Sequence, residues 1–169
     1  MLTLSKKIGF AVFVSAAFFV SNSALAATNK TIDDWQLVCG DKDQDGRDHC
    51  MMTQTIVNPE NNLGILSVAL GTYRNKTQPS IALNLPPQIN QDKEIVLVFD
   101  QETTGHVFHV SSCDGVKCTA VRDMNDGMLN SLKNAKDATV HFDVKGGENV
   151  KVHISLKGFE SAYRQLIQK

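Results

Sequence analysis

The chain has 169 residues with 17 basic and 18 acidic side chains, a length that suits one globular core. Two of the basic residues and none of the acidic ones precede residue 27, so the remaining chain carries a formal charge of −3. This balance excludes the basic footprint of a protein that binds nucleic acid or an anionic membrane.

Residues 1–26 have the organisation of a cleaved secretory leader. Two lysines precede an apolar run from Ile8 to Val20, and the segment ends with Ala24 and Ala26 in an Ala-x-Ala pattern. The run is shorter than the roughly 20 residues of a membrane-spanning helix, so the pattern favours cleavage after Ala26 over a membrane anchor. We therefore expect an exported chain whose mature part, residues 27–169, is a single domain without a transmembrane segment.

Beyond the leader the chain is predicted to be mainly β. Residues 27–33 are polar, and we expect them to be frayed. The apolar residues that follow come in short β-branched runs separated by Gly, Pro, Asn and Asp, which is typical of strands and turns. The nine runs are Trp35 to Cys39, Met51 to Val57, Gly64 to Tyr73, Ser80 to Leu85, Glu94 to Phe99, His106 to Ser111, Cys118 to Arg122, Ala138 to Lys145 and Val150 to Leu156. About nine short strands indicate an antiparallel sandwich or barrel, and we predict the β-sandwich.

The apolar pattern of the last two predicted strands indicates how they pair with each other. The apolar residues that alternate along them are Val140, Phe142 and Val144 in the first and Val150, Val152, Ile154 and Leu156 in the second. A common buried face requires these sets to lie together, since a slip of one residue would turn one set to solvent. His141 and His153 then share the wetter face, where His153 has Asp143 as a candidate partner across the hairpin.

Two short helices are predicted from apolar residues at helical spacing. The stripe of the first helix is Met128, Leu129, Leu132 and Ala135, and Asp126 is its candidate N-cap. The stripe of the second helix is Phe159, Ala162, Tyr163, Leu166 and Ile167. We expect this C-terminal helix to close one end of the sandwich.

All four cysteines, Cys39, Cys50, Cys113 and Cys118, follow the leader, and an exported chain meets an oxidising compartment, so we expect two disulfides. Three connectivities are possible, and the turn-rich segments between near neighbours favour Cys39 with Cys50 and Cys113 with Cys118. A tetrathiolate zinc site is the alternative, but neither spacing is usual for zinc. Trp35, the one tryptophan, is predicted to lie in the core against the first bridge and not on a binding surface.

An acidic segment is the sharpest candidate for a metal site. Asp41, Asp43 and Asp45 alternate before a glycine like the first half of a calcium loop, and Asp48 offers a further oxygen. The twelfth position of such a loop is Met52, where an EF-hand has its bidentate Glu, so an EF-hand is excluded. A weak calcium site is one interpretation, and a solvated acidic hairpin tip is the other.

Motifs for catalysis are missing from the sequence. His106 and His109 are three apart in one predicted strand, so they face opposite ways and do not share a metal. The chain has no Gly-x-Ser-x-Gly elbow, no His-Glu-x-x-His motif and no glycine-rich phosphate loop. We therefore predict no enzymatic activity and, apart from the weak calcium candidate, no cofactor.

Several segments resemble the invasion-associated locus B family of bacterial envelope proteins. They are DWQLVC at 34–39, CMMTQ at 50–54, IALNLP at 81–86, VFHVSSCDGVKCTAV at 107–121 and LKGFESAYRQL at 156–166. The resemblance covers nearly the whole mature chain. It implies a β-sandwich with the two local disulfides, located in the periplasm, at the outer membrane or outside the cell.

The resemblance also carries an expectation about function. Founding members of the family are linked to the entry of bacteria into host cells, while others occur in bacteria without an invasive life. It thus implies a virulence-related protein that binds an unknown protein or a host surface, and it offers no catalytic residues. The alternative is a housekeeping periplasmic module that binds a small ligand or calcium. The acidic DKDQDGRD segment departs from the more Pro- and Gly-rich loop expected of the family.

Overall fold

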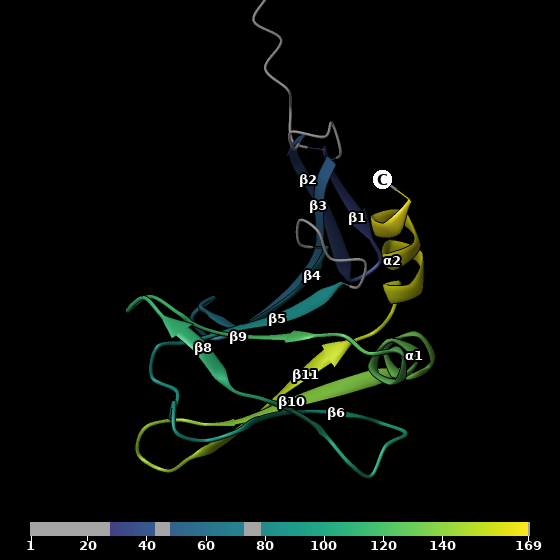
Figure 1. The fold of residues 1–169 in the computed structure, drawn as a ribbon. Helices are drawn as coiled ribbons and strands as arrows, with labels where there is room; N and C mark the ends of the chain where they lie inside the picture. The colour runs from purple at the N-terminus through teal and green to yellow at the C-terminus, as the bar shows by residue number, and fades with distance from the viewer. Residues whose placement is uncertain (1–27, 43–47, 73–78, 169) are drawn as a thin grey trace, which may run out of the picture.

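The computed structural model describes residues 28–42, 48–72 and 79–168, which form two antiparallel sheets and two helices (Figure 1). The larger sheet has the order β1 (Thr28–Ile32), β2 (Trp35–Lys42), β3 (Asp48–Val57), β4 (Gly64–Gly71), β5 (Ser80–Leu85), β9 (Cys118–Asp123) and β8 (Val110–Cys113). The smaller sheet has the order β11 (Asn149–Ser155), β10 (Asp137–Asp143), β6 (Ile95–Phe99) and β7 (His106–Phe108). The helices are α1 (Asp126–Asn134) and α2 (Phe159–Ile167). The predicted mainly β, antiparallel fold is confirmed.

Two strand predictions need correction. The segment 27–33 was expected to be frayed, but residues 28–32 form β1 and pair along their length with β2. A polar segment is stable there because it is an edge strand, which gains ladder hydrogen bonds without having to bury its side chains. The predicted strand from His106 to Ser111 is two strands, since the chain leaves the smaller sheet after β7 and enters the larger one as β8.

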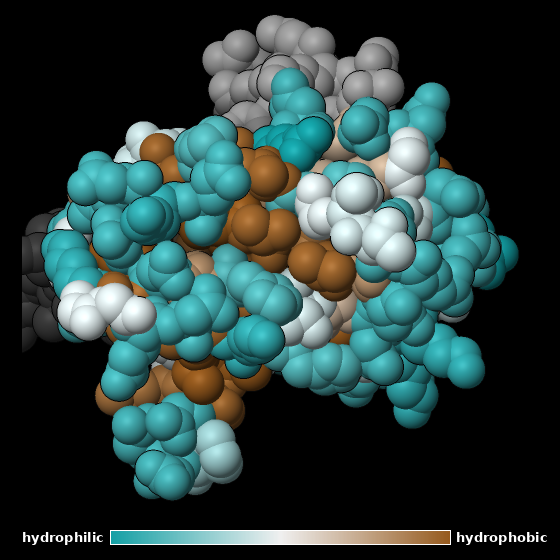
Figure 2. Space-filling model, turned by 90° about the horizontal axis from the view of Figure 1, so that it is seen from below, coloured by the Kyte–Doolittle hydropathy of each residue, from teal (hydrophilic) through white to brown (hydrophobic). Residues whose placement is uncertain are grey.

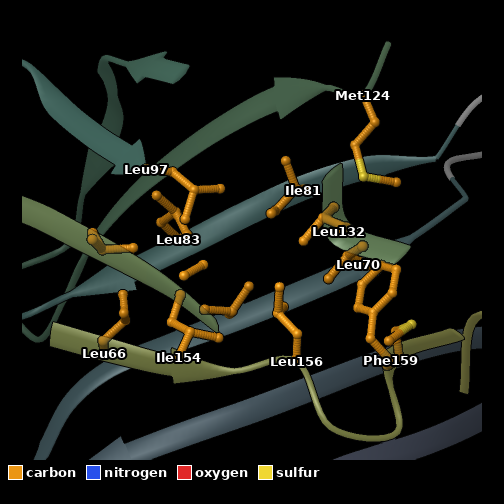
Figure 3. Packing of buried hydrophobic residues seen from close by; sticks show 14 of the residues in the cluster. Leu66, Leu70, Ile81, Leu83, Leu97, Met124, Leu132, Ile154, Leu156 and Phe159 are labelled. Carbon is orange, nitrogen blue, oxygen red and sulfur yellow. The ribbon is translucent and has the colours of Figure 1, made fainter. Parts of the chain in front are cut away.

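The core lies between the layers. Along β4, β5 and β6 every second residue is buried, as expected of strands with one face inward, and Ser80 at the start of β5 is buried as well. Figure 3 shows Leu83, Leu97 and Ile154 among the side chains that meet in this space. The smaller sheet contacts the larger one through β11 with β3 and β7 with β9, whereas α2 contacts β1, β2 and β3.

The local predictions largely agree with these contacts. In the last hairpin Phe142 lies opposite Val150, which is the predicted register. The disulfides are Cys39–Cys50 and Cys113–Cys118, also as predicted. Trp35 is fully buried.

The details of both helices differ from the sequence prediction in one respect each. The N-cap of α1 is Asn125, whose side chain accepts a hydrogen bond from the Met128 N–H, because the predicted cap Asp126 is already the first helical residue. On α2, Ile167 is 53% exposed and so does not belong to the buried stripe. The ring of Phe159 at the start of α2 packs edge-on against Trp35, with 5.3 Å between ring centroids.

One buried amide joins the two sheets. Gln54 lies on β3 and is only 8% exposed. Its Nε2 donates to the carbonyl oxygens of Asp34 at 3.1 Å and Ser155 at 2.9 Å, and its Oε1 accepts from the Ser155 N–H at 3.1 Å. The side chain therefore bonds Ser155 as a neighbouring strand would. It fixes the end of β11 against β3 and the β1–β2 turn.

A close approach of two turns completes this joint. Gly158, just before α2, has a φ of 82°, and a Cβ atom there would stand 2.7 Å from the Ile32 carbonyl oxygen. Only glycine combines this backbone conformation with such contact. The Ser155 hydroxyl also donates to Asp34 Oδ2 at 2.6 Å. The joint thus brings the DWQLVC and LKGFESAYRQL segments together.

We expect Gln54→Leu to lower the free energy of unfolding by about 2 to 3 kcal/mol, because it removes three hydrogen bonds to partly buried backbone groups of Ser155 and Asp34. Gln36→Leu is the matched control, since Gln36 is exposed on the neighbouring strand β2, and a change within about 0.5 kcal/mol is expected there. Denaturant unfolding measures both. Equal stability of the two variants would contradict the role given to Gln54.

Candidate binding surface

The outward face of the larger sheet carries a groove with a floor of small side chains. Ala69 on β4 lies opposite Ala82 on β5, and Gly71 lies opposite Ser80. The neighbouring strands supply larger residues, with Met51 of β3 opposite Gly71 and Val121 of β9 opposite Ala82. A volume of about 430 Å³ lies over this floor, and its remaining lining residues are His49, Cys50, Leu70 and Thr72.

The groove results from the sizes of the side chains that alternate between the two faces of β4. Its inward residues are large and aliphatic, while the outward ones shrink from Ile65 through Ser67 and Ala69 to Gly71 along the strand. Met51 and Val121 beside the floor remain 50% and 39% exposed. Apolar side chains that stay in water around a hollow are typical of a surface that binds a partner.

Polar groups lie at the borders of the groove. The Ser80 hydroxyl donates to Asp123 Oδ1 at 2.7 Å, so it is already satisfied within the sheet. In the next outward row after Ala69, Ala82 and Val121, Thr55 donates to Ser67 at 3.3 Å and Thr119 donates to Asn84 at 2.9 Å. These four residues form one row across β3, β4, β5 and β9, which we call the polar row. It separates the groove from the end of the sheet that carries the β3–β4 and β8–β9 turns.

Part of the outward face of the smaller sheet, at Val96 and Val98 of β6, is covered by its own chain. A Cβ atom on Gly105 would stand 2.3 Å from Val96 Cγ1 and 3.1 Å from Val98 Cγ2, so backbone lies directly over these valines. Figure 2 views the molecule from this side and shows hydrophobic surface surrounded by hydrophilic residues. The groove on the larger sheet combines a hollow with two exposed apolar side chains beside it, and we take it as the candidate binding site.

The predicted metal ligands receive no structural test. Asp41, Asp43, Asp45 and Asp48 fall outside the residues whose side chains are described, so the calcium site stays a prediction. In the part of the chain that the structure describes, no three His, Cys, Asp or Glu side chains are grouped to hold a metal ion.

His141 and His153 of the last hairpin lie on the outward face as predicted, but the partner of His153 differs. His153 Nε2 lies 3.1 Å from Asp137 Oδ1, so the proposed partner Asp143 is wrong. The register places His153 opposite Thr139, from which Asp137 is a diagonal neighbour and Asp143 is too far along the strand. Asp143 instead accepts a hydrogen bond from Asn149 at 2.9 Å.

A cluster of Ser131, Glu102 and His106 has the residue types of a hydrolase but not the geometry. His106 Nε2 contacts one carboxylate oxygen of Glu102 at 3.1 Å, and the Ser131 hydroxyl donates to the other oxygen. The carboxylate stands between the hydroxyl and the imidazole. A nucleophilic serine needs the base itself as its hydrogen-bond partner. We therefore assign the cluster to the attachment of the β6–β7 loop to α1.

Comparison with known proteins agrees with the fold. The family model described as "Invasion associated locus B (IalB) protein" matches residues 35–167, which include both disulfides and the groove. A crystal structure of invasion associated protein b from Bartonella henselae is similar, with a TM-score of 0.73 and 20% sequence identity. The match covers 84% of this chain and 96% of that chain, and at this identity it shows the fold alone. No curated protein sequence matches the chain.

The assignment of the two faces of β5 makes a direct prediction. Ala82→Leu places its side chain in the groove, and we expect the free energy of unfolding to stay within about 0.5 kcal/mol of the unaltered protein. Leu83→Ala changes the adjacent residue, which is fully buried, and should cost about 2 to 5 kcal/mol. Thermal or denaturant unfolding measures both. A larger loss for Ala82→Leu than for Leu83→Ala would show that the faces are wrongly assigned.

Proposed function

Because the chain belongs to the invasion associated locus B (IalB) protein family, we propose that it is an exported envelope protein that acts by binding and not by catalysis. In this proposal the leader is removed after Ala26, and residues 27–169 act as one domain in the periplasm, at the outer membrane or outside the cell. The disulfides support export, since such bonds persist in oxidising compartments. Among the described residues, no helix is long and apolar enough to cross a membrane.

The groove is the observation that carries the binding proposal. Its floor of Ala69, Gly71 and Ala82 leaves room for an apolar side chain of a partner between Met51 and Val121. Burial of such a side chain and of the two exposed walls removes apolar surface from water, which stabilises a complex by about 1.5 to 3 kcal/mol for each fully buried side chain. We propose that a protein partner binds here.

The chemistry near the groove supports binding over catalysis. Both Cys50 and its neighbour Cys39 are in a disulfide, and so are the other two cysteines. The one serine that lines the groove, Ser80, donates a hydrogen bond to the carboxylate of Asp123. The hydroxyl therefore bonds directly to a carboxylate, whereas a serine nucleophile activated by histidine bonds to the imidazole itself.

We further propose that the partner is a protein on the surface of a host cell, and that binding promotes attachment or entry. The family description and the name of the Bartonella henselae protein both refer to invasion. An exposed apolar groove on a domain stapled by disulfides suits a role outside the cytoplasm.

The test is the binding of labelled, oxidised protein to host cells in competition with unlabelled protein. We expect saturable binding, and Ala82→Arg should weaken it at least roughly tenfold, because a charge placed in the groove must be desolvated without a partner. Thr55→Arg is the control, since Thr55 lies on the same face within the polar row and is exposed.

Two outcomes would contradict the proposal at different points. If binding is not saturable, the host-surface role is lost. If binding is saturable but Ala82→Arg and Thr55→Arg bind equally well, the protein has a partner and the groove is not where it binds.

A further inference from the structure

Exposed apolar residues gather at one end of the larger sheet. Six large apolar side chains are exposed among the described residues. Two of them border the groove, and three lie in two hairpin tips, where Val57 is 42%, Leu63 is 65% and Val116 is 80% exposed. We call Val57, Leu63 and Val116 the apolar tips.

Strand register places both tips at the same end of the sheet. The polar row runs across β3, β4, β5 and β9, and each hairpin turn follows within a few residues of it. Strands are spaced about 4.8 Å apart, so the two turns project side by side at a separation of roughly 10 to 20 Å. Figure 1 shows the β8–β9 hairpin extending away from both helices.

The β3–β4 tip is held open by its own hydrogen bonds. The Asn58 N–H donates to the Leu63 carbonyl oxygen at 2.8 Å, and the Asn58 side chain accepts from the Glu60 N–H at 2.8 Å. The Leu63 N–H donates to the Asn61 side chain at 3.0 Å. These bonds order the turn, and the Leu63 side chain projects from it into solvent.

The β8–β9 tip is fixed even more firmly. The Cys113–Cys118 disulfide closes it, and Asp114 Oδ1 accepts hydrogen bonds at 2.9 Å from the N–H groups of Val116 and Lys117. These backbone hydrogen bonds hold the pKa of Asp114 below its usual value. Val116 thus projects from a small rigid loop.

The shape and charge of this end indicate the kind of partner. The apolar tips project separately from two turns. A protein partner would need one pocket for each projecting side chain. The interfacial region of a lipid bilayer can bury apolar side chains without such matched pockets. The charged residues at the tips are Glu60, Asp114 and Lys117, with a net charge of −1. Attraction to anionic headgroups is therefore not the driving force.

We propose that the apolar tips insert into the interfacial region of a zwitterionic lipid bilayer and hold the protein peripherally at a membrane. Such contact leaves the groove free, because Met51 is six residues from Val57 along β3, about 20 Å away. The inference concerns a different surface from the groove and does not depend on the proposed function.

Flotation of the exported, oxidised protein with phosphatidylcholine vesicles tests this proposal. One myristoyl chain binds a bilayer with an association constant of roughly 10⁴ M⁻¹. Three partly inserted side chains bury less apolar surface, so we expect about 1 mM lipid to be needed to detect their binding. We expect the protein to float, with no increase when phosphatidylglycerol is included. Leu63→Ser with Val116→Ser should reduce the bound fraction at least roughly tenfold.

The matched control is Met51→Ser with Val121→Ser, which removes two exposed apolar side chains beside the groove and should float like the unaltered protein. Val116→Asp is a second tip variant that keeps both turns and should also lose binding. No flotation, equal losses in the tip and groove variants, or binding that requires anionic lipid would each overturn the proposal. Ala82→Arg and the tip variants alter different surfaces, so loss of groove-dependent binding to host cells and loss of flotation are separate outcomes.

Discussion

The hydrogen bonds of one buried side chain, Gln54, hold the end of β11 and the β1–β2 turn against β3. An amide in a core is unfavourable unless its polar atoms are bonded, and here the bonds go to backbone groups of Asp34 and Ser155. Because those groups belong to the β1–β2 turn and to the end of β11, three parts of the chain distant in sequence must meet. The helix α2 begins four residues after Ser155, which brings the ring of Phe159 against Trp35.

The same strand that carries Gln54 also organises the exposed face. Its outward residues include Met51 at the groove, Thr55 in the polar row and Val57 at the apolar tips. The face is therefore divided along the strands into an apolar groove, a polar row and an apolar end. Since side chains alternate between faces, residues that fix the sheets together set the position of those available to partners.

Local sequence features predicted the parts of the fold that local physics decides. The strand runs and the register of the last hairpin follow from alternation, and the disulfides follow from pairs that bracket turns. The edge strand β1 was not predicted, because its stability comes from pairing with β2 and not from apolar periodicity. The groove was not predicted from the sequence for a similar reason. Ala82 faces Val121 only because β5 pairs with β9, and that neighbour is far along the chain and not marked by any turn signal.

The central claim is that the groove on the larger sheet is the surface that binds a partner. A photo-crosslinking amino acid in place of Ala82, in oxidised protein bound to host cells, tests it most directly. We expect one crosslinked partner that excess unlabelled protein removes, and no such product when the same group replaces the exposed Gln36 on β2. Cells that bind the protein but crosslink only through Gln36 would show that the partner binds elsewhere.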